Sequence, residues 1–377
     1  MNWLVRRRVA FAFAAAFALA SPSFGQSAAP RIQLLRELVL DAEREDFPVV
    51  NGGRVNTRLD IALTIRQDYQ VRVYDGNGKR LATIGRKGQA PGEFLSPQAQ
   101  GWLADTIWIY DATLKRHAFY TRDGRLLRTA PLETLARSVR VVGDSARAQL
   151  TDFLPWVRRS DGALVGTAAI ARDERTGSTR ERVLAALRRD GTAIKLTNTD
   201  QDSRWEIDVA FTPFPAASPS GREIVVASVS DLAVSGAYVL LSRFDERGTA
   251  RGVTRVPYTG VPYPAELRDR LLKRGNGPDQ NQTVTASRVP KVQPPVYNLL
   301  VRDDGIVLLM LRGTADSQSA TLIDARGVVR GVFELPTKAD VIATLGDHVW
   351  LRERDRDDLV SIVRYRMLCG RRACALE

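Results

Sequence analysis

The sequence of 377 residues predicts an all-β protein, and three observations lead to that fold class. Short runs rich in Val, Ile, Leu, Tyr and Phe follow one another along the chain, and tight-turn signals separate them at regular intervals. The last group of runs lacks one strand, and a spare strand stands at the opposite end of the chain. These features predict a ring of six four-stranded units, which is the six-bladed β-propeller.

Two kinds of turn signal alternate along the chain and define the units. Each pair marks two hairpins and therefore four strands, the unit of one blade. Gly, Asn and Asp suit these points because two-residue hairpin loops require positive φ. The first kind occurs at Leu59-Asp60, Ala104-Asp105, Asp161-Gly162, Ser220-Gly221, Asp304-Gly305 and Gly346-Asp347, and the second at Asn77-Gly78, Asp123-Gly124, Asp190-Gly191, Arg247-Gly248, Arg326-Gly327 and Asp357-Asp358.

Two consecutive units show the repeat most clearly. The first unit contains residues 60–65 and 71–75 and the turn at Gly78. The same pattern recurs in the second unit at residues 105–111 and 116–119, with the turn at Gly124. Apolar and polar residues alternate in 71–74, as expected for a strand whose two faces differ.

The two ends of the chain are expected to close the ring together. The last unit has strands near 341–345, 349–352 and 359–365 but no fourth strand, and residues 32–40 supply a spare one. Pairing these ends would hide both strand edges. The alternative is an amphipathic helix over 30–45, because Leu34, Leu35, Leu38 and Leu40 partly fit that period; the strand is favoured.

The N-terminus has the pattern of a cleavable secretory signal over residues 1–25. Arg6, Arg7 and Arg8 precede an apolar run at 9–20, and small residues follow. Cleavage after Gly25 or after Ala20 fits the pattern. The run is too short to span a bilayer comfortably. We therefore expect a periplasmic or secreted protein with no membrane span, whose propeller occupies residues 26–368.

The charge is strongly basic but gives no clear partner. Removal of the three signal arginines takes the formal net charge from +12 to +9. The remaining Arg residues are scattered among Asp and Glu, which favours a solvated mixed surface over a polyanion site. We expect a monomer and no nucleic-acid partner.

The only two cysteines, Cys369 and Cys374, lie in the C-terminal tail of residues 369–377. In an exported protein this spacing favours a small disulfide loop, with free thiols as the alternative. A structural zinc site would need about four ligands, and both histidines, His117 and His348, lie far away in sequence.

One insertion stands out between the fourth and fifth units. Residues 264–274 predict a short helix with Pro264 in its first turn and Gly275 at its stop. Residues 275–295 are rich in Gly, Asn, Gln and Pro and predict a loop. Helix and loop together could form a lid beside the central channel.

The segment Ile-Gly-Arg-Lys-Gly-Gln-Ala-Pro-Gly-Glu-Phe at 84–94 carries a resemblance to known proteins. With Pro97, the run 108–111 and Arg116, and with weaker matches at 304–305, 324–327, 335–336 and 363–365, it resembles exported bacterial six-bladed propellers of the NHL and TolB-like group. The resemblance implies the fold and the compartment. It implies no single activity, because such propellers include lactonases, lyases, scaffolds and receptors.

Signatures of catalysis are few. The sequence contains no Gly-x-Ser-x-Gly elbow, and two histidines are too few for the multi-histidine metal centre of propeller lyases. For His117 and His348 a structural or surface role is favoured over catalysis.

A channel metal is the remaining enzymatic possibility. Lactonase-type propellers hold a divalent cation with oxygen ligands from their innermost strands, and this resemblance would imply a hard cation such as Ca²⁺ here. A solvated channel rim, or pairing with Arg158 or Arg204, explains the candidate ligands equally well. These candidates are Asp152, Glu206, Asp208, Asn298 and Asp340.

Aromatic residues in Pro-rich segments give the main hypothesis. Phe214, Tyr258 and Tyr263, with Arg268 and Arg270 of the inserted helix, are expected at one rim as a docking surface for a protein, peptide or glycan. Trp102, Trp108 and Trp350 are expected to pack inside. The sequence therefore favours a non-enzymatic exported binding module, with a metal-dependent lactonase-type hydrolase as the alternative and an envelope assembly component as a third interpretation.

Overall fold

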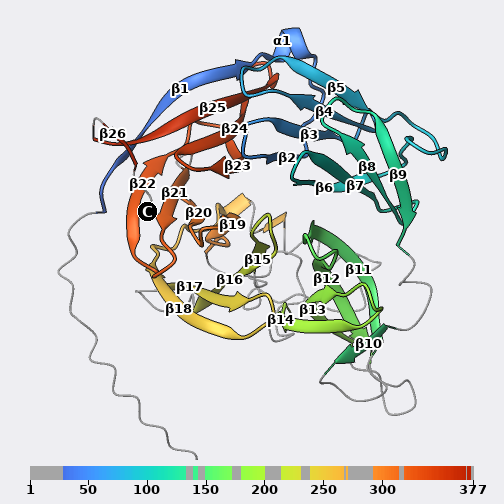
Figure 1. Cartoon of the computed structure of the whole chain (residues 1–377). Helices are drawn as coiled ribbons and strands as arrows, with labels where there is room; N and C mark the ends of the chain where they lie inside the picture. The colour runs from blue at the N-terminus through green and yellow to red at the C-terminus, as the bar shows by residue number, and fades with distance from the viewer. Residues whose placement is uncertain are drawn as a thin grey trace, which may run out of the picture.

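The computed structural model describes residues 29–132, 139–142, 149–171, 180–199, 214–230, 238–266, 269–270, 292–313, 318–370 and 372–374. These residues form six blades arranged in a ring around a central channel (Figure 1). The chain is a six-bladed β-propeller, as the turn pattern predicts.

Each blade is built on an antiparallel sheet of four strands, to which blade three adds one more strand. The four strands lie in sequence order from the channel outward in blades one to five, and β1 completes blade six. The strands of blades one and two are β2 (Gly52–Val55), β3 (Ile61–Ile65), β4 (Gln70–Tyr74), β5 (Arg80–Ile84), β6 (Pro97–Leu103), β7 (Thr106–Asp111), β8 (Arg116–Thr121) and β9 (Leu126–Pro131).

Blades three and four have longer strands and more interruptions. Blade three carries an extra strand, β10 (Val139–Val142), which pairs with the innermost strand β11 and, in parallel, with the outermost strand β14. The other strands are β11 (Gln149–Arg158), β12 (Leu164–Ala171), β13 (Arg180–Leu187) and β14 (Ala193–Asn198) in blade three, and β15 (Phe214–Ala217), β16 (Glu223–Ser230), β17 (Tyr238–Asp245) and β18 (Ala250–Pro257) in blade four.

Blades five and six complete the ring, and the N-terminal strand closes it. Blade five contains β19 (Val296–Val301), β20 (Val307–Arg312), β21 (Gln318–Ile323) and β22 (Val329–Glu334); blade six contains β23 (Asp340–Leu345), β24 (His348–Arg354), β25 (Val360–Cys369), the short β26 (Arg372–Ala373) and β1 (Ile32–Leu40).

The closing strand β1 pairs antiparallel with β25, from Ile32 opposite Cys369 to Leu40 opposite Ile362. The predicted strand is thus confirmed over the alternative helix. The register shifts between Arg36 and Leu38, and a four-residue helix that the sequence analysis did not anticipate, α1 (Ala42–Glu45), follows the strand.

Six apolar clusters fill the seams, the surfaces where neighbouring blades pack together, in the described part of the chain. In β3, Ile61 and Leu63 enter the seam with blade six, whereas Ala62 between them enters the seam with blade two. The alternation follows from the two-residue period of a strand. Trp108 and Trp350 are 2% and 1% exposed, which confirms their expected packing; Trp102 is partly buried.

The signature segment at 84–94 forms the connection between blades one and two. Phe94 is 1% exposed and packs in the seam of these blades. Gly85 has φ of +88°, and a Cβ atom there would lie 2.3 Å from the Phe94 ring. Both the backbone conformation and the lack of space for a side chain therefore require glycine. Arg116 donates hydrogen bonds to the carbonyls of Gln89, Ala90 and Glu93 and holds the loop in place.

The twelve predicted turns occur in the structure, and each contains a residue with positive φ. Several are one residue longer than predicted. In the turn after β4, the Asp75 N–H donates to the Lys79 carbonyl across a three-residue loop in which Gly78 has φ of +84°. This arrangement is a type I turn followed by a left-handed residue, the usual three-residue hairpin loop.

The twelve turns gather at one face of the ring, here called the turn face, where arginines tie neighbouring blades together. Burial alone would raise the pKa of Asp60, but hydrogen bonds from Arg122 of blade two and from Asn56 lower it below its usual value. In the described residues such arginine contacts cross five seams: Arg122 to Asp60, Arg159 to the Glu246 carbonyl, Arg243 to the Gly305 carbonyl, Arg302 to the Gly346 carbonyl and Arg364 to the Gly76 carbonyl.

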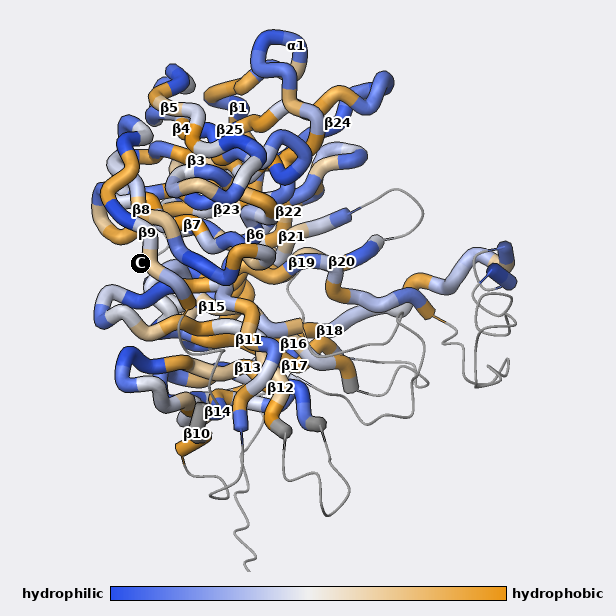
Figure 2. Tube along the Cα trace, turned by 90° about the vertical axis from the view of Figure 1, so that its right-hand side faces the viewer, coloured by the Kyte–Doolittle hydropathy of each residue, from blue (hydrophilic) through white to orange (hydrophobic). Residues whose placement is uncertain are grey.

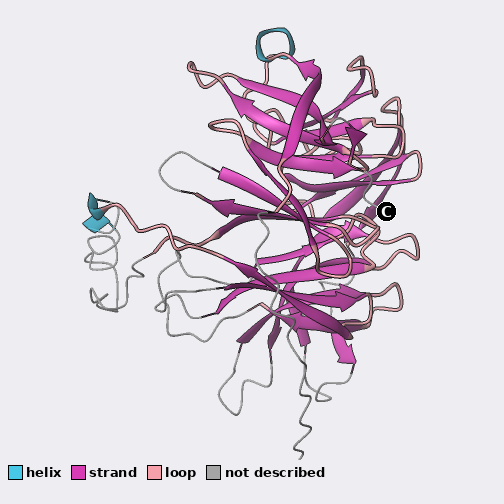
Figure 3. Cartoon of the chain, turned by 90° about the vertical axis from the view of Figure 1, so that its left-hand side faces the viewer, coloured by secondary structure: helices cyan, strands magenta, loops and turns pink. Residues whose placement is uncertain are grey.

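The opposite face carries the longer connections. The helical residues Ala265, Glu266, Asp269 and Arg270 stand away from the ring on this face (Figures 2 and 3). The rest of the predicted helix and most of the predicted lid loop lie outside the described residues, as does the expected signal. In the described part of the chain, no helix has the length and apolar character that crossing a membrane requires.

Candidate functional site: the central channel

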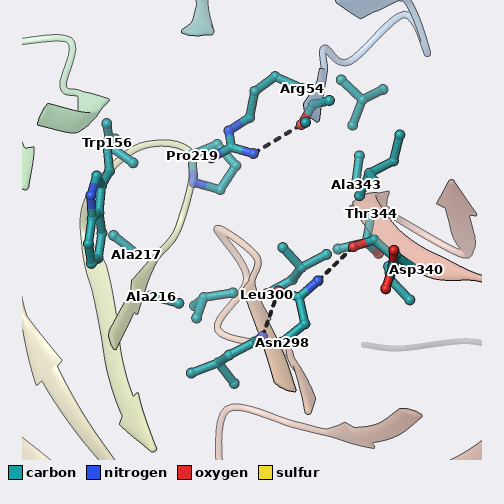
Figure 4. A pocket seen from close by; sticks show the side chains of 18 of the residues that line it. Arg54, Trp156, Ala216, Ala217, Pro219, Asn298, Leu300, Asp340, Ala343 and Thr344 are labelled. Carbon is teal, nitrogen blue, oxygen red and sulfur yellow. Dashed lines mark hydrogen bonds between the residues drawn. The ribbon is translucent and has the colours of Figure 1, made fainter. Parts of the chain in front are cut away.

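The central channel contains a cavity of about 410 Å³ bounded by the innermost strands of blades one, three, four, five and six. A smaller cavity of about 160 Å³ shares residues 51–54 and Trp156 with it and reaches Gln98 and Gln100 of blade two. Figure 4 shows the larger cavity, with Arg54, Trp156, Asn298 and Asp340 around it. Ligand sites in proteins commonly have volumes of about 300–1,000 Å³.

Arg54 is the distinctive residue of this cavity. Its guanidinium donates one hydrogen bond, of 3.0 Å, to the Gly53 carbonyl. No described acidic side chain pairs with it, although a guanidinium has five N–H donors. Its side chain is partly buried among the blades, and this burial lowers the pKa of Arg54. A group this basic stays protonated at neutral pH, so its positive charge has no acidic partner among the described residues.

Two neighbouring blades hold the backbone of Arg54 in position. The indole Nε1 of Trp102, in blade two, donates to the Arg54 carbonyl at 2.9 Å. On the other side, a Cβ atom at Gly53 would lie 3.1 Å from the Ile342 side chain of blade six. The tight approach at Gly53 and the bond from Trp102 fix β2 between its neighbours.

The second cation of the channel, Arg352, is neutralised. Its guanidinium donates to the Asp340 carboxylate and, at 2.5 Å, to the Val50 carbonyl. The negative charge of Asp340 is therefore paired with Arg352. The described lining residues therefore carry two positive charges and one negative charge, which leaves the charge of Arg54 in excess.

Apolar side chains form part of the remaining cavity wall. Trp156 presents its ring to the channel (Figure 4), beside Ala216, Ala217 and Pro219 of blade four. Burial, followed by the nearby Asp340 charge, raises the pKa of Tyr297, so its phenol is neutral. The cavity thus combines a cation with an aromatic surface.

The structure brings together two of the five predicted metal ligands. Asn298 and Asp340 both line the cavity. The Asn298 amide donates to the Val341 carbonyl at 2.8 Å, and its oxygen accepts the Leu299 N–H. Asp152 lies in β11 with φ of +50° and is not among the lining residues. Glu206 and Asp208 lie outside the described residues. In the part that is described, no three His, Cys, Asp or Glu side chains are grouped as metal ligands.

The predicted aromatic rim needs correction at two positions. Tyr258 and Tyr263 are only 8% and 9% exposed, so their rings are packed inside the protein rather than displayed for docking. The Tyr258 hydroxyl accepts the Val261 N–H, a hydrogen bond within this Pro-rich segment. Phe214 is partly buried against the seam of blades four and five. Arg270 is exposed, and Arg268 lies outside the described residues.

The histidines and cysteines have structural surroundings. His117 is 2% exposed, and burial, together with the nearby charges of Arg158 and Arg128, lowers its pKa to about 3. His348 contacts the carboxylates of Glu37 and Asp347 where β1 closes the ring. Cys369 and Cys374 form a disulfide with Cα atoms 4.9 Å apart.

Comparison with known proteins finds similar solved structures but no similar sequence. No family model matches the chain, and no curated protein matches it. A member of the DUF4221 family from Bacteroides vulgatus has a TM-score of 0.48 and 10% identity over 90% of this chain and 99% of that one. A protein from Bacteroides fragilis described as exported has a TM-score of 0.43 and 10% identity over 91% and 96%.

Virginiamycin B lyase from Staphylococcus aureus has a TM-score of 0.40 and 9% identity, over 90% of this chain and all of that one. Likeness at this level assigns no ligand and no activity to this chain.

The sequence patterns single out neither Arg54 nor Trp156 as a site residue. One signal was present: Arg54 follows Gly52 and Gly53 directly before the first turn, in the innermost strand of its blade. A glycine inside a strand often marks a close approach of neighbouring chain, as Gly53 does here.

Proposed function

We propose that the protein is an exported binding module that holds part of its partner in the channel cavity and performs no chemistry on it. The observation that carries this proposal is the guanidinium of Arg54, which pairs with no described acidic side chain, in a cavity of about 410 Å³ with an aromatic wall. A few convergent polar groups beside apolar and aromatic side chains are typical of a ligand site. The expected N-terminal signal supports export to the periplasm or the exterior.

Blocking the channel at Gly52 tests this proposal. A Cβ atom at Gly52 would meet nothing within 4 Å, so a side chain there extends into the cavity without disturbing the blades. Wild-type, Gly52→Phe and Gly52→Ala proteins would be immobilised and exposed to envelope extract. We expect the wild type and the alanine variant to retain the same partner and the phenylalanine variant to lose it. Equal capture by all three would place binding outside the channel.

A metal-dependent hydrolase of the lactonase type is the second candidate, because Asn298 and Asp340 line one cavity. The thermal midpoint with EDTA and then with Ca²⁺, Mg²⁺ or Zn²⁺ tests it, since a ligand of the native state raises the midpoint. A rise with one cation, abolished in Asn298→Ala and accompanied by lactone turnover, would favour the hydrolase. No shift with any cation would remove this candidate.

A further inference from the structure

The charge balance of the channel constrains what can bind there. Among the described lining residues, Asp340 neutralises Arg352 and nothing neutralises Arg54. A partly buried charge without a partner is costly because its hydration is reduced. A ligand with one negative charge would remove this cost, whereas a cation or a neutral sugar would leave it in place.

The hydrogen-bonding geometry favours a carboxylate. Arg54 uses one N–H on the Gly53 carbonyl. Its planar fork can offer two parallel N–H groups to a carboxylate, and such charge-assisted pairs are about twice as strong as neutral hydrogen bonds. Trp102 and the close packing at Gly53 hold the backbone of Arg54 in place, so binding would cost little backbone conformational entropy.

The shape and lining of the cavity indicate the rest of the ligand. Trp156 and Arg54 line both the larger and the smaller cavity, so one ligand can reach both residues. Ala216, Pro219 and Leu300 extend the apolar wall. A planar or aromatic group would lie against Trp156 while an acid at its end reached Arg54.

We propose that the channel binds an organic monocarboxylate of about dipeptide size, pairing the carboxylate with Arg54 and placing an apolar or aromatic body against Trp156. This inference rests on the proposed function and names the ligand class of the same site. A free acid and the C-terminal residue of a peptide share this chemistry.

The experiment uses a matched pair of probes, N-acetyl-L-phenylalanine and N-acetyl-L-phenylalaninamide, which differ only in the carboxylate. Titration calorimetry and tryptophan fluorescence on the mature protein would report affinity. We expect the acid to bind at least tenfold more tightly than the amide and to change the fluorescence. The change should disappear in Trp156→Phe. Acetyl-phenylalanyl-phenylalanine would test whether a peptide C-terminus binds as well as the single residue.

Two variants separate the guanidinium from general electrostatics. Arg54→Gln should lower the affinity for the acid at least tenfold and abolish the preference over the amide, and Arg54→Lys should restore part of it. Arg58→Gln is the control, because Arg58 lies four residues away, is exposed and already pairs with Asp105 at 2.9 Å. It should leave both affinities unchanged.

Several outcomes would overturn the inference: equal affinity for acid and amide, undiminished binding of the acid by Arg54→Gln, binding of inorganic phosphate alone, or no binding of either probe at millimolar concentration. If one of these occurs while Gly52→Phe still abolishes partner capture, the binding function stands and the carboxylate assignment fails. If capture is insensitive to Gly52→Phe, the proposed function itself fails.

Discussion

Arginine side chains have different surroundings in the seams between blades and in the central channel. In the seam of blades four and five, the Arg243 side chain is 5% exposed and donates to Glu223 and to the carbonyls of Gly305 and Asp324. In the channel, Arg54 has one bond to the Gly53 carbonyl. Arg243 thus has a carboxylate partner within its own blade, whereas Arg54 has none among the described residues, and this difference marks Arg54 as a place for a ligand.

The largest effect is expected where an apolar seam is emptied. Phe94→Ala should lower the free energy of unfolding by about 3–5 kcal/mol, because a fully buried ring would leave a cavity between blades one and two. Denaturant unfolding would measure the change. The control Leu127→Ala, at a position 46% exposed, should change it by less than about 0.5 kcal/mol. A loss below about 1 kcal/mol for Phe94→Ala would mean that this seam is not packed as described.

The seam arginine should come next. Arg243→Ala should lower the free energy of unfolding by about 3 kcal/mol, because Glu223 and two carbonyls would lose the hydrogen bonds that Arg243 donates. The control is Arg326→Ala, at a side chain 77% exposed whose carboxylate partner is 3.7 Å away. Equal losses for the two variants in urea unfolding would show that the buried Arg243 stabilises the fold no more than the exposed Arg326 does.

A pH dependence should arise from His117 in the seam of blades two and three. The unfolded chain binds a proton at this residue below about pH 6.5, whereas the folded protein does so only near a pKa of about 3. Stability should therefore fall as the pH falls through this window, by up to about 1.4 kcal/mol per pH unit from this group. His117→Phe should have the shallower slope between pH 6 and pH 4 in urea unfolding. Parallel slopes would show that His117 titrates normally in the fold.

The smallest effect is expected from an exposed contact between blades. Arg58 and Asp105 form a salt bridge of 2.9 Å with side chains 56% and 60% exposed. A double-mutant cycle with alanine should give a coupling of less than about 1 kcal/mol, because solvent and salt screen such pairs. A larger coupling would show that exposed ion pairs between blades also stabilise the fold.

The fold could be predicted from sequence because its signals are local. Each turn needs a residue that tolerates positive φ, and these residues recur at a visible spacing, as at Gly78 and Gly124. The closing strand could be predicted because β25 would otherwise present a bare edge. The helix α1 escaped notice because its four residues give too short a pattern to recognise.

The site could not be predicted in the same way because it is assembled from distant parts of the chain. Arg54, Trp156 and Asp340 come from three blades, and neither composition nor spacing shows which arginine has no acidic partner among the described residues. Pro-rich sequence around Tyr258 and Tyr263 predicts exposed loops, yet the structure buries both rings. Burial depends on what packs over a segment, which a local pattern does not contain.

The most direct test compares the unfolding free energies of Arg54→Gln and Arg243→Gln in the same buffer without ligand. We expect Arg54→Gln to match the stability of the wild type within about 0.5 kcal/mol or to exceed it, because a desolvated charge is removed. Arg243→Gln should lose about 3 kcal/mol. Equal, large losses for both variants would contradict the assignment of Arg54 to a ligand site, because Arg54 would then be a structural residue like the arginines of the seams.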